Sequence, residues 1–266
     1  MTSFVENSIF SEYLHREVHL SIIIPADLDP LRVYKLLLFN DGQDFAELQM
    51  NRQLNLLYAE KKIEQVIVVG IHANHNRIQE YGTAVRADYA GRGVFAGATT
   101  KFVIHELLPL LVRHYPIRDQ GNIYAGCSLG GLMALDIAWH HPHYFSKVAV
   151  FSGALWWRGK AVGYGYENSD RIMHAQIRES YSMPALKFWF QTGTQDETDD
   201  RDGDGVIDSI QDTLECISEL ERKGYGWGHD ICYLEVQDGK HDTSTWSAVL
   251  PDFCQWAFGV RADTAS

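Results

Sequence analysis

The sequence lacks long apolar runs and has little positive charge. No stretch approaches the roughly 20 consecutive apolar residues that a membrane-spanning helix requires. Acidic residues number 35 and basic residues 23, which gives a formal net charge of −12 at pH 7. A strongly negative protein repels phosphate groups, so neither nucleic acid nor an anionic membrane surface is expected as a partner.

Cysteine is scarce, and no targeting segment is visible. The four cysteines, at positions 127, 216, 232 and 254, match no zinc-binding or Cys-x-x-Cys spacing. Residues 1–10 are polar and lack the basic start and apolar stretch of a signal peptide. We therefore expect free thiols and a cytoplasmic protein.

Apolar runs of strand length alternate with amphipathic segments of helix length. The predicted strands are 18–24, 36–39, 66–69, 122–125, 148–151, 188–191 and 232–236. The predicted helices are 44–60, 102–114, 129–140, 209–223 and 244–258. This alternation indicates an α/β fold with a mostly parallel sheet and helices on both faces. With no repeat, low-complexity segment or linker, residues 1–266 are expected to form one domain.

A nucleophile motif lies between a predicted strand and a predicted helix. The run GCSLGG at 126–131 contains Gly-x-Ser-x-Gly with Ser128 at its centre and Gly131 as an additional glycine. In a nucleophile elbow, a serine on a tight strand-to-helix turn projects its oxygen from the sheet edge, and the glycines avoid a collision. The alternative is an ordinary glycine-rich turn. The flanking strand and helix favour Ser128 as a nucleophile, rather than its neighbour Cys127.

The order serine, acid, histidine predicts the partners of Ser128. His241 follows the last predicted strand after a tight turn, whereas His229 is the other histidine near the last strands. Asp196 is the first carboxylate after the strand at 188–191 and would orient His241. The competing carboxylates follow closely; they are Glu197, Asp199 and Asp200.

Two backbone N–H groups are needed to stabilise an oxyanion. We expect one from Leu129, at the start of the helix, and the other from Gln43, in the loop after the strand at 36–39. Residues 152–184 are rich in Gly, Trp and Tyr and are interpreted as an insertion over the site. Trp156 in this insertion and Arg77 near the end of a strand are candidate substrate contacts.

Several segments in this order resemble the esterase D-like family of α/β-hydrolases. They are residues 36–43, 126–131, 193–196 and 239–246. Residues 40–43 and 76–81 are similar to the enterochelin-esterase-like branch of that family. The resemblance implies an α/β-hydrolase fold and hydrolysis of a small-molecule ester through an acyl-enzyme, with no cofactor required for catalysis. A siderophore ester is not favoured, because the chain is acidic overall.

An acidic loop follows the predicted acid. The run DDRDGDGVID at 199–208 places Asp200, Asp202 and Asp204 at positions one, three and five of a calcium loop, with Asp208 at nine. Position twelve is Gln211 instead of the usual glutamate. We expect a structural Ca²⁺ on these four aspartates; the alternative is a solvated loop that caps the following helix.

The sequence thus predicts a serine carboxylic ester hydrolase. Two alternatives remain: a thioesterase or acyltransferase that uses the same triad, and a non-catalytic binding protein on a hydrolase scaffold. The oligomeric state and the ester itself are not predicted by the sequence.

Overall fold

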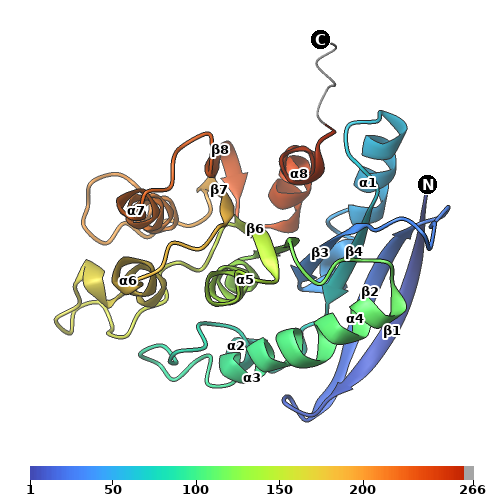
Figure 1. The fold of residues 1–266 in the computed structure, drawn as a ribbon. Helices are drawn as coiled ribbons and strands as arrows, with labels where there is room; N and C mark the ends of the chain where they lie inside the picture. The colour runs from blue at the N-terminus through green and yellow to red at the C-terminus, as the bar shows by residue number, and fades with distance from the viewer. Residues whose placement is uncertain (261–266) are drawn as a thin grey trace.

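One eight-stranded sheet runs through the computed structural model, which describes residues 1–260 (Figure 1). Its strand order is β1-β2-β4-β3-β5-β6-β7-β8. Strands β3 to β8 are parallel, whereas β1 and β2 run antiparallel to their neighbours. The strands are β1 (Thr2–Ser11), β2 (Arg16–Pro25), β3 (Lys35–Asn40), β4 (Val66–Ile71), β5 (Asn122–Cys127), β6 (Phe145–Phe151), β7 (Lys187–Gln195) and β8 (Ile231–Lys240).

Helices cover both faces of the sheet, as predicted (Figure 1). One face carries α1 and α8, and the other carries α4, α5 and their neighbours. The helices are η1 (Gly42–Phe45), α1 (Met50–Ala59), α2 (Arg77–Glu80), α3 (Ala96–Lys101), η2 (Phe102–Leu107), α4 (Leu108–His114), α5 (Leu129–His140), η3 (Asn168–Asp170), α6 (Ile172–Glu179), α7 (Asp208–Lys223) and α8 (Thr243–Phe258). Among the described residues, no helix combines the length and apolar character needed to cross a bilayer.

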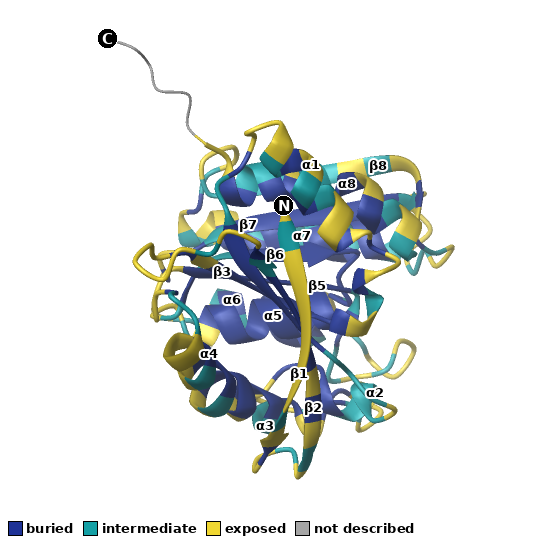
Figure 2. Ribbon diagram, turned by 90° about the vertical axis from the view of Figure 1, so that its right-hand side faces the viewer, coloured by how far each residue is buried: buried dark blue, intermediate teal, exposed yellow. Residues whose placement is uncertain are grey.

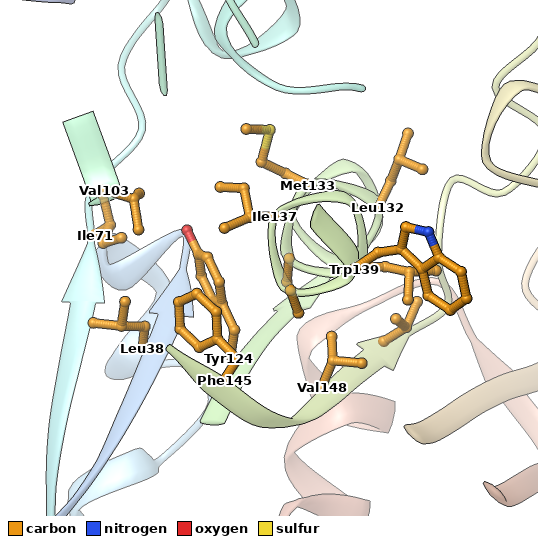
Figure 3. Packing of buried hydrophobic residues seen from close by; sticks show 14 of the residues in the cluster. Leu38, Ile71, Val103, Tyr124, Leu132, Met133, Ile137, Trp139, Phe145 and Val148 are labelled. Carbon is orange, nitrogen blue, oxygen red and sulfur yellow. The ribbon is translucent and has the colours of Figure 1, made fainter. Parts of the chain in front are cut away.

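The central strands divide their side chains between two hydrophobic cores. In β3, Leu36 and Leu38 enter the core beneath α5, while Leu37 and Phe39 enter the core beneath α1 and α8. This division follows from the two-residue period of a strand, because successive side chains point to opposite faces. Figure 3 shows Leu38 and the stacked rings of Tyr124 and Phe145 under α5. Strands buried on both faces explain the nearly continuous apolar runs in the sequence.

All seven predicted strands are present, and the structure adds an eighth. The added strand, β1, was missed because its side chains are mostly exposed and it carries no buried apolar pattern. Its pairing with β2 depends on backbone hydrogen bonds, which the side-chain pattern does not reveal. The burial map in Figure 2 shows β1 as a largely exposed strip at the front of the molecule.

Two predicted helices and the predicted insertion need correction. The helix expected over 44–60 begins only at Met50, because the chain first forms η1 and then turns through Gln49, which has a left-handed φ of 53°. The helix at 102–114 is π-helical over its first half. This widening precedes Pro109, which has no N–H to donate and crowds the preceding turn. The segment 152–184 contains α6, whose short apolar face packs into the core.

Replacing Leu38 by alanine tests the packing of the core beneath α5. Leu38 is fully buried, so the substitution leaves a cavity and is expected to lower the free energy of unfolding by about 2–5 kcal/mol. Leu56 on α1 is 46% exposed, and its replacement by alanine serves as the control, with a change of about 0.5 kcal/mol or less. Denaturant unfolding measures both; equal losses would contradict the packing described here.

Candidate active site

Ser128 occupies a strained turn between β5 and α5. Its φ of 56° and ψ of −124° are rarely adopted by residues other than glycine. The glycines around it are required by close backbone contact: a Cβ at Gly126 would lie 2.4 Å from the carbonyl carbon of Gly130, and one at Gly131 would lie 2.8 Å from the oxygen of Gly126. This is the geometry of a nucleophile elbow, in which strain is maintained to expose the serine.

His241 and Asp196 lie at the same edge of the sheet. His241 follows β8, and the next residue caps α8 by accepting a hydrogen bond from the Thr245 N–H at 2.8 Å. Asp196 follows β7 and is 9% exposed, with its Oδ2 accepting a hydrogen bond from the Gly193 N–H at 3.0 Å. The register of β7 and β8 pairs Gln195 with Lys240, which brings the two loops together.

His241 and Asp196 each influence the pKa of the other. Desolvation lowers the pKa of His241, the Asp196 carboxylate opposes this effect, and the Arg77 guanidinium lowers the pKa further. Burial raises the pKa of Asp196, against the Gly193 N–H, the Ser152 hydroxyl and His241, which lower it. His241 is therefore biased toward its neutral form, which is the form that accepts a proton. Within the described residues, no hydrogen bond joins His241 to Ser128; such contacts are often long before substrate binds.

An aromatic side chain supports the histidine. The rings of His241 and Trp246 meet edge to face, with centroids 5.2 Å apart. The Trp246 Nε1–H donates to the Ser152 hydroxyl at 2.9 Å in a buried contact. Trp246 thereby links His241 to the end of β6, next to the elbow. Ser152 was not predicted from the sequence as part of this network.

The competing carboxylates have neighbours of their own in the acidic loop. Burial raises the pKa of Glu197 to about 7, and its charged neighbours are Asp208, Asp199 and Asp212, with the Ser209 N–H opposing the shift. These groups surround the start of α7, not the elbow. His241 is among the causes of the pKa shift of Asp196, and it is not among those of Glu197.

The loop after β3 lies directly beside the elbow. Asn40 donates from Nδ2 to the Gly130 carbonyl at 2.7 Å and accepts from the Tyr124 hydroxyl at 2.9 Å. Gln43 lies in η1, which packs so closely on β4 that a Cβ at Gly42 would approach the Gly70 carbonyl carbon to 2.4 Å. Leu129 is the first residue of α5, where backbone N–H groups have no partner within the helix. The two expected oxyanion donors therefore lie on adjoining segments.

Asp41 is a site residue that sequence reasoning missed. It has a left-handed φ of 63°, and Arg77 binds its carboxylate through two hydrogen bonds of 2.7 Å each. A Cβ at Gly130 would lie 2.7 Å from Asp41 Oδ2, so this carboxylate is at the start of α5. The Gln43 side chain also donates to Asp41, at 3.2 Å, and accepts from the Ala73 N–H at 3.0 Å. The Asn-Asp-Gly-Gln run could have signalled Asp41 as a turn residue.

Trp156 is half-buried against the core beneath α5. The Arg92 guanidinium carbon lies 4.8 Å from the centre of the Trp156 ring, and Arg92 also pairs with the buried Asp88. Arg158 lies 5.5 Å from the ring centre of Tyr89 in the same group of loops. Trp156 in the insertion thus lies near aromatic and arginine side chains of the loop between α2 and α3, which were not predicted as contacts.

The structure gathers three of the four predicted calcium ligands. Carboxylate oxygens of Asp200, Asp202 and Asp204 lie within 4.8 Å of one another. Asp208 departs from the prediction: it begins α7 and pairs with Arg201, whose backbone N–H donates to Asp208 Oδ1 at 2.9 Å. Loop N–H groups also donate to the three gathered carboxylates. The bound ion remains a prediction.

A calcium titration tests this loop. Ca²⁺ binding to the folded state alone would raise the melting temperature, because binding energy adds to the stability of that state. We expect a higher melting temperature in millimolar Ca²⁺ than in EDTA, and a loss of this difference in Asp202→Asn. Identical melting curves for the unaltered chain in the two buffers would contradict the prediction.

The sheet, its covering helices and the elbow together define an α/β hydrolase. The family model "Esterase: Putative esterase" matches residues 11–256, and the chain belongs to this esterase family. It is therefore a carboxylic ester hydrolase by family, in agreement with the resemblance of its motifs to the enterochelin-esterase-like branch.

The chain is also similar to individual proteins, in sequence or in structure. The uncharacterized protein YjcH of Bacillus subtilis is 27% identical over 249 residues, covering 92% of this chain and 93% of YjcH. The iron(III) enterobactin esterase of Dickeya dadantii is 26% identical over 157 residues, covering 57% of this chain and 33% of that protein. Among solved structures, a ferulic acid esterase has a TM-score of 0.73 at 17% identity, with 97% of each chain covered. The enterobactin esterase FES of Shigella flexneri has a TM-score of 0.74 at 21% identity, covering 96% of this chain and 58% of FES.

Proposed function

We propose that the protein cleaves small-molecule carboxylic esters through an acyl-enzyme on Ser128. The observation that carries this proposal is the strained, glycine-flanked turn of Ser128 at the sheet edge to which the β7 and β8 loops bring Asp196 and His241. A serine hydroxyl needs a base to become an effective nucleophile, and His241 is biased toward the neutral form that can serve.

In this mechanism, Ser128 Oγ attacks the ester carbonyl while His241 takes its proton. The alcohol then leaves with a proton from His241, and the acyl group remains on Ser128. A water molecule, deprotonated by His241, attacks the acyl-enzyme and releases the acid. Asp196 orients the imidazole and stabilises its protonated form. The N–H groups of Leu129 and Gln43 are the proposed donors to the oxyanion of both tetrahedral intermediates.

The neighbouring cysteine is a poor alternative nucleophile. Burial raises the pKa of the Cys127 thiol well above its ordinary value, and the nearby Asp41 carboxylate raises it further. A buried, protonated thiol is unreactive, since the thiolate is the nucleophilic form. Ser128 is half-exposed at the turn, whereas Cys127 is buried at the end of β5.

An ester that carries an aromatic group is the substrate class that we propose. Trp156 lies in the insertion that begins beside the elbow, where the Ala154 N–H donates to the Ser128 carbonyl at 3.1 Å. Arg92, from the loop between α2 and α3, stacks its guanidinium on the Trp156 ring, so the two offer an aromatic face and a planar cation. Arginines near the site are matched by carboxylates, in the pairs Arg77–Asp41 and Arg92–Asp88. The overall charge of −12 therefore does not describe this surface, and the name of the ferulic acid esterase, which refers to an aromatic acid, agrees with an aromatic substrate.

Replacing Ser128 tests the nucleophile. Ser128→Ala is expected to lower kcat for p-nitrophenyl esters by at least about 10³-fold and to abolish labelling by a fluorophosphonate probe, because the attacking oxygen is gone. Cys127→Ala is the matched control, one residue away, and should retain both labelling and turnover. Full labelling of Ser128→Ala, or loss of activity in Cys127→Ala alone, would contradict the assignment.

The pH dependence of kcat/KM tests His241 and its charged neighbours. Since Arg77 lowers the pKa of His241, Arg77→Met should raise that pKa and move the acidic limb of the profile to higher pH. Asp196→Asn should move the limb to lower pH, because the carboxylate that favours the imidazolium is removed, and should also lower kcat. Arg52→Met, on the exposed face of α1, is the control and should leave the profile unchanged. An acidic limb at the same pH in all variants would contradict this electrostatic account.

A further inference from the structure

Strand β1 forms an open edge of the sheet. The strand order ends at β1, which pairs with β2 over all ten residues without a bulge. Figure 2 shows the strand running along the surface, with most of its residues exposed. An edge of this length is a template for pairing with another strand.

The direction of the free hydrogen-bonding groups follows from the pairing with β2. The Ala26 N–H donates to the Met1 carbonyl at 2.9 Å, and Thr2 lies opposite Pro25, which has no N–H. In an antiparallel pair, hydrogen-bonded and non-hydrogen-bonded positions alternate. The odd-numbered residues of β1 therefore bond to β2, and the even-numbered residues direct their N–H and C=O groups outward. One of these outward N–H groups already has a partner within residues 1–260: the Ser8 N–H donates to the side chain of its neighbour, Asn7 Oδ1, at 2.8 Å.

This edge has few of the features that prevent pairing. Natural edge strands commonly carry lysine, proline or bulges. In β1 there is no lysine, arginine or proline, and the single charged residue is Glu6. Large apolar side chains are exposed instead: Phe4 is 47%, Val5 38% and Phe10 52% exposed.

The residues of β1 are arranged as a chemical palindrome about Asn7. Two residues at the same distance from Asn7, one on each side, are similar in size or polarity. The matched pairs are Glu6 with Ser8, Val5 with Ile9, Phe4 with Phe10, and Ser3 with Ser11. An antiparallel copy in this register places even residues opposite even residues, so the outward groups face each other. It also places Glu6 opposite a serine, whereas parallel in-register pairing would stack two glutamates.

We propose that β1 pairs with β1 of a second copy of this chain, around a two-fold axis through Asn7. The two sheets then become one continuous sheet, and the outward N–H and C=O groups of each edge gain partners. Phe4 of each copy packs against Phe10 of the other, and Val5 against Ile9. Such pairs across strands are the elements that stabilise a sheet.

Charge substitutions at the paired phenylalanines test this arrangement. By light scattering coupled to size exclusion, the unaltered chain should have twice the mass of one chain. The double variant Phe4→Glu, Phe10→Glu places carboxylates opposite each other at two positions and should have the mass of one chain. The double variant Phe4→Glu, Phe10→Lys places opposite charges there and should restore the dimer. A monomeric unaltered chain at high concentration overturns the proposal, as does a dimer that persists in the double glutamate variant; far-UV circular dichroism verifies that each variant is folded.

A cross-link tests the register. In the proposed pairing, Asn7 faces its own copy at a non-hydrogen-bonded position, where Cα atoms lie about 4.5 Å apart, within the usual range for a disulfide. Asn7→Cys should therefore form a disulfide-linked dimer under mild oxidation. Val5→Cys is the matched control: its two copies would lie four residues apart along the strands, about 13 Å, and should not cross-link. Equal cross-linking of the two variants, or none in Asn7→Cys, overturns the proposed register.

Discussion

The backbone contact between β5 and α5 is the constraint on which the site depends. Helix α5 starts so close to the sheet that no side chain fits at Gly126 or Gly131, and Ser128 between them is forced into a conformation that costs on the order of 1–3 kcal/mol. The surroundings hold it there. The Ser128 N–H donates to the Phe151 carbonyl, and the Ser128 carbonyl accepts from the N–H groups of Gly131 and Ala154. Strand β6, helix α5 and the insertion thus all fix the same residue.

Charge at the site is arranged locally and cannot be judged from the whole chain. The carboxylate of Asp41 lies at the start of α5, where the helix dipole favours negative charge, and Arg77 neutralises it with paired hydrogen bonds. Arg77 also acts on His241, whose pKa it lowers. One ion pair therefore connects the loop after β3, the elbow and the histidine. The acidic excess of the chain is concentrated elsewhere, in part in the loop around Asp202.

The strands of the sheet differ in burial, and this explains which strands could be predicted from the sequence and which could not. Strands β3 and β5 are buried on both faces over most of their length, so each has a continuous apolar run that can be recognised in the sequence. Strand β1 is exposed on most of its length and is held by the β2 backbone, which is invisible in the pattern. Helix α6 was missed for a related reason: it has only eight residues, too few for a clear period.

The sequence by itself determined the alternation of strands and helices, the elbow at Ser128 and the order in which its candidate partners follow. These are local properties, since burial on both faces and close glycine contacts each require particular residues at particular positions. Only the tertiary structure showed that Asp196 and His241 influence each other's pKa, which aspartates gather in the acidic loop, and that Arg77 binds Asp41. Those contacts join residues that are distant in the chain or crowded within one loop. Their geometry depends on how the strands pair and where the loops meet. The spacing of residues along the sequence does not specify either of these.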